Sequence, residues 1–267
     1  MTPRMIYAYQ EQPYKQTFKI ARETRVCAPL FVVHITDGEH IGRGELGLQS
    51  LKHETQASVA AQLEDIARTI ADIGTREALN RAVPAGSARN GVDCALWDLE
   101  CKRSGRSIWD LAGVARQDRI EVDITIGINA ADKMRRDALA AVGRGYRLLK
   151  IKADADSVLD RVAAIAEAAP GLRFIVDANE AWSLAQLEAL APALKALNVV
   201  TIEQPLHHDR DAALASYDSP VPLCADESCA TREGLDVLAE RYDAVNIKLD
   251  KTGGLTEALA LARAARE

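Results

Sequence analysis

The sequence lacks the features that would assign it to a membrane, secreted or nucleic-acid-binding class. No apolar run approaches the length of a membrane-spanning helix, and the N-terminal residues lack the apolar core of a secretory signal. Lysine and arginine (33) are outnumbered by aspartate and glutamate (39), and the net charge of −6 offers nothing to attract nucleic acid or an anionic membrane. We expect a cytoplasmic protein with a small-molecule partner, no nucleic-acid partner and no membrane partner.

Cysteine is scarce, and its pattern argues against two kinds of structure. The five cysteines are an odd number at irregular spacings, so neither a disulfide framework nor a thiolate metal site is predicted. Apolar residues, in contrast, are plentiful, at 48% of the 267 residues. The chain can therefore bury a large core, in one big domain or in two ordinary ones.

Residues 1–117 are expected to form an α+β domain. Runs rich in β-branched and aromatic residues predict strands at 4–10, 26–35 and 40–45. Asp37-Gly38 predicts a turn between the last two, so the strands form an antiparallel meander. The spacing of apolar residues predicts one helix over 53–71 and another that runs from Ser87, a candidate N-cap, to Leu99.

In residues 118–267, short apolar strands alternate with Ala- and Leu-rich helices, which indicates βα units with parallel strands. The predicted strands are 121–126, 147–152, 173–177, 199–203, 222–226 and 244–248. Charged residues at their ends lie 22 to 26 residues apart, about one βα unit of a (β/α)8 barrel. A doubly wound sheet would share this period, but the glycine-rich phosphate turn of that fold is absent. We predict a TIM-like barrel with a helix in every gap.

Five successive predicted strands end in charged side chains. These residues are Lys150 and Lys152, Asp177, Glu203, Asp226 and Lys248. The C-terminal ends of barrel strands form the active-site face, where an unpaired charge costs several kcal/mol. A single aspartate there would be read as a helix cap or a surface ion pair, but the recurrence on five strands indicates a shared purpose.

Three of these residues, Asp177, Glu203 and Asp226, are carboxylates on consecutive strands. Oxygen ligands select a hard cation, and the absence of histidine and cysteine from the set argues against zinc. Mg²⁺ takes few carboxylates and leaves coordination positions for water or substrate. The pattern therefore predicts one Mg²⁺ per active site.

Lys150 and Lys152 lie two apart on one strand, so both are predicted to face the barrel interior while Ile151 faces the helices. Two like charges in one pocket should depress each other's pKa toward the range of a general base. Lys248 ends the sixth strand, four strands from Lys152, so these two lysines are expected to face each other across the pocket. One lysine would remove a proton and the other return it, with the metal supporting an enolate-like intermediate.

The motifs resemble those of a known family. They are Lys150-Ile151-Lys152, Asp177-Ala178-Asn179-Glu180, Glu203-Gln204-Pro205, Asp226-Glu227-Ser228, the stretch Lys248 to Gly254, and Ala88-Arg89-Asn90 through Leu99. Together they resemble the muconate-lactonising branch of the enolase superfamily, and within it the L-Ala-D/L-Glu dipeptide epimerases most. The resemblance implies an N-terminal α+β capping domain on a modified (β/α)7β barrel, about six of whose strands lie in this sequence.

The same resemblance implies roles for single residues. Lys152 would act on the R-configured substrate and Lys248 on the S-configured one, with Lys150 as a supporting and substrate-contacting residue. Arg25, in the segment after the first strand, would bind the glutamate side-chain carboxylate, although an ordinary surface arginine is the alternative. Thr125 would contact the substrate or simply be a β-branched strand residue.

Other residues are candidates for supporting roles. Asn179 and Glu180 would orient the metal ligands or simply belong to a loop, and Asp250 could orient Lys248 by an ion pair. His207-His208 suggests a metal site, but adjacent side chains on an extended backbone diverge, so a loop surface is the preferred interpretation. The sequence does not determine the oligomeric state, and a homo-oligomer stays open.

Alternatives remain for the function. Another lysine-pair enzyme, namely a muconate cycloisomerase, an N-acylamino-acid racemase or an o-succinylbenzoate synthase, would share these motifs. Family members continue for about two more βα units beyond the position of Glu267, and dipeptide epimerases carry an Asp-x-Asp motif on the last strand. We therefore expect the sequence to be incomplete, with a truncated, non-catalytic barrel as the alternative.

Overall fold

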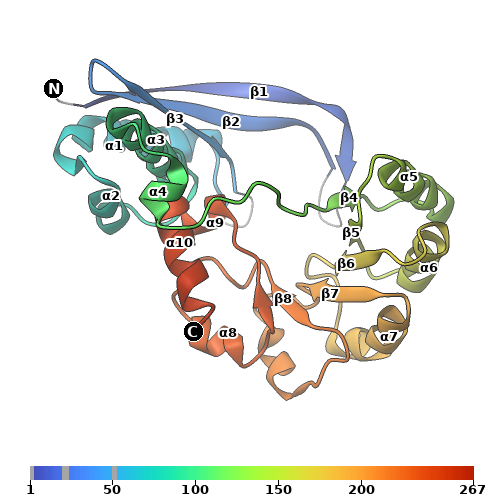
Figure 1. Ribbon diagram of the computed structural model, residues 1–267. Helices are drawn as coiled ribbons and strands as arrows, with labels where there is room; N and C mark the ends of the chain where they lie inside the picture. The colour runs from blue at the N-terminus through green and yellow to red at the C-terminus, as the bar shows by residue number, and fades with distance from the viewer. Residues whose placement is uncertain (1–2, 20–23, 50–52) are drawn as a thin grey trace.

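The computed structural model describes residues 3–19, 24–49 and 53–267, which form two sheets and their helices (Figure 1). A three-stranded antiparallel sheet comes first in the chain and a six-stranded parallel sheet second. One hydrophobic cluster draws on residues between Met5 and Leu99 and the other on residues between Ile126 and Leu261. We propose the division into residues 1–117 and 118–267, because each part has its own core.

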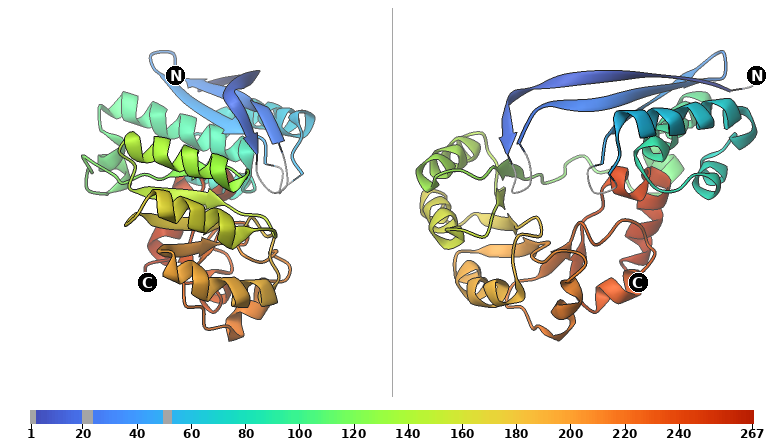
Figure 2. Two further views of the ribbon diagram at one scale, coloured as in Figure 1. Left: turned by 90° about the vertical axis from the view of Figure 1, so that its right-hand side faces the viewer. Right: turned by 180° about the vertical axis from the view of Figure 1, so that it is seen from behind.

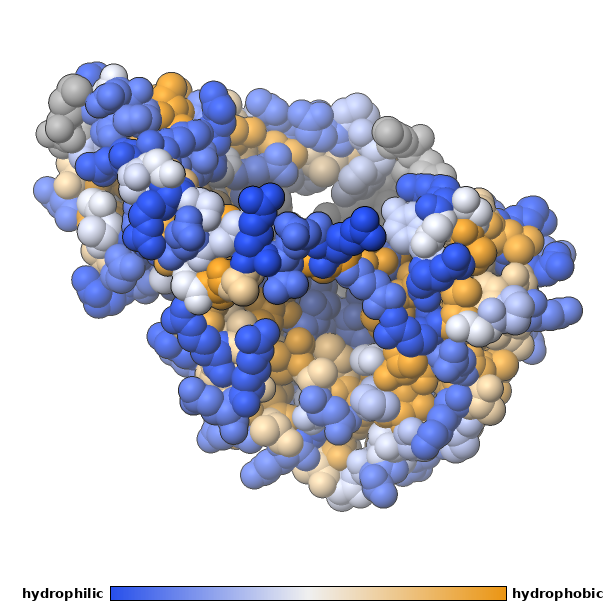
Figure 3. Space-filling view, viewed as in Figure 1, coloured by the Kyte–Doolittle hydropathy of each residue, from blue (hydrophilic) through white to orange (hydrophobic). Residues whose placement is uncertain are grey.

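The N-terminal sheet is the predicted meander, with two longer strands than expected. Its strands are β1 (Arg4–Lys19), β2 (Thr24–Thr36) and β3 (Ile41–Gly47). The predicted turn is present at Asp37-Gly38, where Asp37 Oδ1 accepts the backbone N–H groups of Glu39 and His40. The β1–β2 hairpin extends from the N-terminal helices to the parallel sheet (Figure 1), and the surface is hollowed beneath it (Figure 3).

Four helices accompany the meander: α1 (Gln56–Ile73), α2 (Arg76–Ala82), α3 (Ser87–Ser104) and α4 (Ile108–Ala112). The prediction of Ser87 as N-cap is wrong. The N-cap is Gly86, and Ser87 instead donates its backbone N–H and hydroxyl to the Glu54 carboxylate. Helix α3 lies so close to β3 that a Cβ on Gly44 would stand 1.9 Å from the carbonyl oxygen of Gly91, which requires glycine at position 44.

The parallel sheet has the strand order β4-β5-β6-β7-β8-β9. Its strands are β4 (Ile124–Ile126), β5 (Leu148–Lys152), β6 (Arg173–Asp177), β7 (Val199–Glu203), β8 (Leu223–Ala225) and β9 (Ala244–Val245). The segments between and after them form α5 (Ala131–Gly143), α6 (Val158–Ala168), α7 (Leu184–Ala196), the 3₁₀ helix η2 (Asp211–Ser216), α8 (Leu235–Ala239), α9 (Leu249–Thr252) and α10 (Leu255–Ala264). Six parallel strands in sequence order confirm the predicted βα organisation.

Two details differ from the prediction. The gap between β7 and β8 holds only the short helix η2, and Pro220 and Pro222 keep it from extending to β8 because they lack the N–H that a helix interior needs. Lys248 lies beyond β9, since the chain leaves the sheet after Val245 and Lys248 becomes the N-cap residue of α9.

Helix α3 joins the two parts of the molecule by packing on α9 and α10 (Figure 2). Arg89 donates to the carbonyl oxygens of Gly253 (3.0 Å) and Thr252 (2.6 Å). Trp97 Nε1 donates to Thr256 Oγ1 at 3.0 Å. The segment that begins with Lys248 is therefore held from the N-terminal part. None of the helices within the described ranges has both the length and the apolar character needed to cross a membrane.

Candidate active site

The strand ladder builds one half of the site from β5, β6 and β7. In the parallel register, Lys152 is paired with Asp177, and Asp177 with Glu203. Lys152 Nζ lies 2.6 Å from Asp177 Oδ2, and Lys150 Nζ lies 2.8 Å from the same oxygen and 2.7 Å from Glu203 Oε2. Ile151 points the other way, into the hydrophobic core. The prediction that both lysines share one face is confirmed.

The other half of the site lies on loops that follow β8 and β9. Lys248 Nζ is 2.5 Å from Asp226 Oδ2, and Lys251 Nζ is 2.7 Å from Asp226 Oδ1. Lys251 also donates to the backbone carbonyls of Asp226 and Asn246. Asn246 connects the two halves, because its Nδ2 donates to Glu203 Oε1 at 2.9 Å.

The three carboxylates Asp177, Glu203 and Asp226 meet between the lysines. Each offers an oxygen within 4.8 Å of the others, and all three side chains are buried. Burial and the negative charge of Asp177 raise the pKa of Glu203 to about 7. Burial opposes the ionisation of Asp226 as well, but the positive charges of Lys251 and Lys248 outweigh it and lower its pKa.

Lys150 does not have the depressed pKa that repulsion by a neighbouring ammonium predicts. Burial acts to lower the pKa of Lys150, but the charges of Asp177 and Glu203 outweigh it and raise that pKa. The Lys248 pKa is raised in the same way, chiefly by Asp226. The expectation was wrong for Lys150, because this lysine contacts two carboxylates, whose attraction exceeds the repulsion between ammonium groups.

The chemistry of the carboxylate cluster fits a hard divalent cation. Its three members are carboxylates, with no imidazole or thiolate, which suits Mg²⁺ and disfavours zinc. Besides burial, the negative charges of Asp177 and Asp226 raise the pKa of Glu203. A cation among these oxygens would relieve that repulsion, so the residues present fit the predicted ion.

The remaining predicted residues lie at different distances from this centre. Asn179 belongs to it, because its Oδ1 accepts from Lys152 Nζ at 2.8 Å. Thr125 is the register partner of Lys150, on β4. Arg25 lies on β2 rather than in a loop, and its side chain is outside the described part of the structure. No ion pair between Asp250 and Lys248 occurs among the described residues, where Asp250 accepts from the Lys251 N–H.

Gln204 is a site residue that the sequence reasoning did not assign. Its side chain is fully buried, and its Oε1 accepts the backbone N–H groups of Asp226 (2.9 Å) and Ser228 (3.2 Å). Its Nε2 donates to the Leu206 carbonyl, Ser228 Oγ and Tyr242 OH. Gln204 thus holds the backbone that carries Asp226. In the sequence, this role could have been suspected because a polar residue directly follows the predicted metal ligand Glu203.

Lys251 was also missed. It stands three residues after Lys248, one turn along α9. Its buried ammonium group contacts Asp226, as the ammonium group of Lys248 does. The spacing of the two lysines alone does not reveal this, because the contact depends on how the segment after β9 folds back.

With this geometry in place, comparisons with known proteins identify the class. Residues 4–113 match the family model "Mandelate racemase / muconate lactonizing enzyme, N-terminal domain", and residues 133–267 match "Enolase C-terminal domain-like". The chain belongs to the enolase superfamily, as its motifs predicted.

The chain is similar to a curated epimerase and to a curated racemase. It is 42% identical to the L-Ala-D/L-Glu epimerase of Escherichia coli, over 98% of this chain and 82% of the relative. It is 47% identical to an N-acetyl-D-glutamate racemase of Pseudoalteromonas over 71% of this chain and 59% of that relative. These relatives, with the superfamily fold, make the chain an isomerase of the epimerase type.

Solved structures agree. One enolase-family member from Agrobacterium tumefaciens, with bound sodium and L-Ala-L-Glu, shares 38% identity and a TM-score of 0.94 over 99% of this chain and 80% of that chain. A dipeptide epimerase from Enterococcus faecalis, solved with Mg and L-Leu-L-Tyr, shares 27% identity and a TM-score of 0.91 over 100% of this chain and 80% of that chain. The capping domain and parallel sheet are therefore those of this fold.

Proposed function

We propose that this enzyme interconverts L-Ala-D-Glu and L-Ala-L-Glu by proton transfer between two lysines, with one Mg²⁺ per active site. The observation that carries the proposal is the arrangement of Lys152 and Lys248 at either end of the carboxylate cluster, one on Asp177 and the other on Asp226. β5, which ends in Lys152, and β9, which precedes Lys248, are separated by three strands of the sheet. A substrate α-carbon between the two amines would be open to attack from both faces.

Lys152 and Lys248 would exchange the roles of acid and base. For the R-configured substrate, Lys152 removes the α-proton and Lys248 delivers one to the opposite face; for the S-configured substrate the roles reverse. Each direction requires one lysine to be neutral and the other protonated. Asp177 and Asp226 hold each Nζ in place.

Asp177, Glu203 and Asp226 would hold the cation, which supplies Lewis-acid stabilisation of the charge that develops on the substrate carboxylate. Lys150 lies on the same side of β5 as Lys152 and would add positive charge beside that carboxylate. Asn179 would position the Lys152 amine through its 2.8 Å contact.

Glutamate is the residue that we expect at the reacting position. The names of the two curated relatives and the ligand of the Agrobacterium structure all contain it. Arg25 would bind the glutamate side-chain carboxylate, and Thr125 would contact the substrate. Murein-derived dipeptides in the cytoplasm would supply such a substrate.

The test is solvent deuterium exchange in the protein expressed from its complete reading frame. With Mg²⁺ in D₂O, both L-Ala-L-Glu and L-Ala-D-Glu should incorporate deuterium at the glutamate α-carbon and approach one common mixture, as followed by proton NMR. Chelation of the metal should abolish incorporation. Absence of exchange from both diastereomers would refute the proposal.

A second candidate is racemisation of an N-acylated glutamate. The 47% identity with the N-acetyl-D-glutamate racemase favours it, and the same two lysines would serve its proton transfer. The two substrates differ in the free ammonium group, which only the dipeptide has. The ratio of kcat/KM for L-Ala-D-Glu to that for N-acetyl-D-glutamate decides between them, and a ratio below one would favour the racemase.

A further inference from the structure

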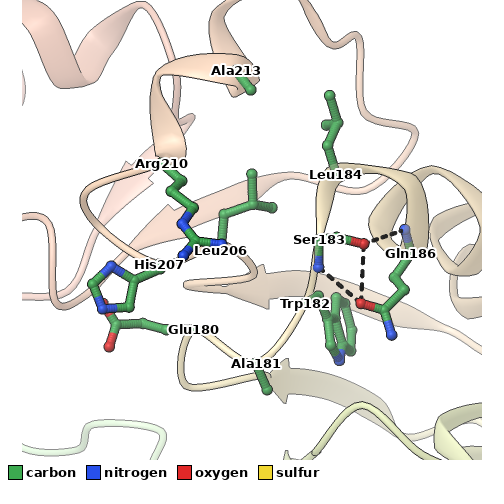
Figure 4. A pocket seen from close by; sticks show the side chains of 10 residues that line it. All are labelled: Glu180, Ala181, Trp182, Ser183, Leu184, Gln186, Leu206, His207, Arg210 and Ala213. Atoms are coloured by element: carbon green, nitrogen blue, oxygen red, sulfur yellow. Dashed lines mark hydrogen bonds between the residues drawn. The ribbon is translucent and has the colours of Figure 1, made fainter.

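A cavity of about 460 Å³ lies beside the loops that follow β6 and β7 (Figure 4). It is lined by Glu180, His207 and Arg210, among others, and the Glu180 carboxylate and the His207 imidazole lie next to each other at one end. None of these side chains belongs to the carboxylate cluster described above. The cavity therefore has polar groups that the proposed reaction does not use.

Two imidazoles meet at this place. The rings of His207 and His208 stack with their centroids 4.3 Å apart and their planes 26° from parallel. The expectation that adjacent histidines diverge was wrong, because the chain turns here, with the Arg210 N–H bonded to the His207 carbonyl at 2.8 Å. His208 also contacts Glu180, whose Oε1 accepts its backbone N–H at 3.0 Å and lies 2.5 Å from its Nδ1.

A second carboxylate is within reach of both rings. Asp209 Oδ2 lies 3.7 Å from His207 Nδ1, and Asp209 Oδ1 lies 3.5 Å from His208 Nε2. Two imidazoles and two carboxylates are a donor set with the charge to neutralise a divalent cation. Asp209 is well exposed and can move toward an ion, whereas the Glu180 side chain is only 4% exposed.

We propose that Glu180, His207 and His208 form a second metal site, which binds Zn²⁺ and has Asp209 or water as its fourth ligand. Each of the three residues offers a ligand atom within 4.8 Å of the others. Zinc bonds of about 2.0–2.2 Å need ligand atoms roughly 3.5 Å apart, a movement of about 1 Å that the half-exposed histidines can make. Imidazole nitrogens select zinc over magnesium, so the two sites differ in their preferred ion.

The backbone around Glu180 prepares it for this role. Glu180 has a positive φ of 70°, and its N–H is bonded to the Gln204 carbonyl at 2.9 Å. Its carboxylate is thereby directed toward the loop that carries the histidines. A zinc ion there would tie the loop after β6, which includes Asn179, to the loop after β7, which includes Gln204.

The experiment is a zinc titration of the complete, metal-stripped protein after saturation with Mg²⁺, so that the oxygen-only cluster does not compete. Calorimetry should detect one equivalent of Zn²⁺ per chain, and Co²⁺ should give the visible absorption of a site with nitrogen ligands. Binding should weaken as the pH falls, because imidazole must lose its proton to ligate. Absence of any zinc binding in the presence of Mg²⁺ would overturn the proposal.

Variants separate this site from simple surface chelation. His207→Ala, His208→Ala and Glu180→Gln should each weaken Zn²⁺ binding by at least about tenfold. His40→Ala is the matched control, because His40 has a carboxylate, Asp37, at 3.9 Å, and no second imidazole contacts it within the described part of the chain. The affinity of this variant for Zn²⁺ should equal that of the unaltered protein. Unchanged affinity in Glu180→Gln would mean that the imidazole pair alone binds the ion, and the three-ligand site would be wrong.

Discussion

The two lysines proposed as acid and base are held in different ways. Lys152 is the last residue of a five-residue strand, and its side chain is 10% exposed. Lys248 follows a two-residue strand, caps a one-turn helix and is 41% exposed. The strand ladder positions Lys152, whereas Lys248 depends on contacts from distant parts of the chain.

Those distant contacts come from two directions. Gln204 fixes the backbone of Asp226, the carboxylate that Lys248 contacts. Arg89, in the N-terminal part, donates to the carbonyls at the end of α9, the helix that Lys248 begins. The capping domain thus supports one half of the site directly, so damage to it should affect α-proton exchange from the two substrates unequally.

The largest expected effect comes from removing each lysine. Lys152→Ala should lower deuterium exchange from the R-configured substrate, L-Ala-D-Glu, by at least about 100-fold, while some exchange from L-Ala-L-Glu persists. Lys248→Ala should do the reverse, because each lysine faces one side of the α-carbon. Proton NMR in D₂O measures both rates. Lys195→Ala, at the end of α7, is the control. Equal losses in the two active-site variants would indicate a shared structural role instead.

A second expected effect concerns pH. In the metal-free protein the Glu203 pKa is about 7, above its value of about 4.3 in an unfolded chain. The folded state therefore binds the proton more tightly, and the stabilisation is present below pH 4.3 and lost as the pH rises through 7. The free energy of unfolding should fall by about 4 kcal/mol over this range relative to Glu203→Gln.

Urea unfolding of both proteins in the presence of a chelator measures this difference. Subtracting the Glu203→Gln curve removes the contributions of the histidines and the other carboxylates. Parallel curves for the two proteins would show that Glu203 does not titrate in this range. Added Mg²⁺ should flatten the pH dependence, because an ion at the cluster favours the ionised carboxylate.

The sequence could predict the half of the site that lies on regular strands better than the half that lies beyond them. Lys152, Asp177 and Glu203 end regular strands, and Lys150 lies two residues before the end of β5, so unit spacing and side-chain alternation were sufficient to bring them together. The prediction was weaker where the chain leaves the sheet: Lys248 lies outside its strand, and Asp250 contacts the Lys251 N–H rather than the Lys248 amine. Such positions depend on tertiary contacts, which no local pattern encodes.

A third prediction tests the support from the capping domain. Arg89→Lys keeps the charge but loses the fork that reaches two carbonyls. Exchange from the S-configured substrate, which depends on Lys248, should fall by about tenfold, with a smaller change for the R-configured one. Arg103→Lys, on the same helix and exposed, is the control. An equal loss for both substrates would mean that Arg89 stabilises the protein without positioning Lys248.

The smallest expected effects come from one tryptophan in each half. Trp97 Nε1 donates to Thr256 at the interface between α3 and α10, and Trp182 Nε1 donates to the Asp154 carbonyl beside β5. Trp97→Phe and Trp182→Phe each remove one hydrogen bond and should each lower the free energy of unfolding by about 1 kcal/mol.

If the capping domain supports only the Lys248 half, Trp97→Phe should slow exchange from the S-configured substrate more than from the R-configured one, and Trp182→Phe should not. The same ratio of exchange rates in both variants would show that the two halves respond as one unit.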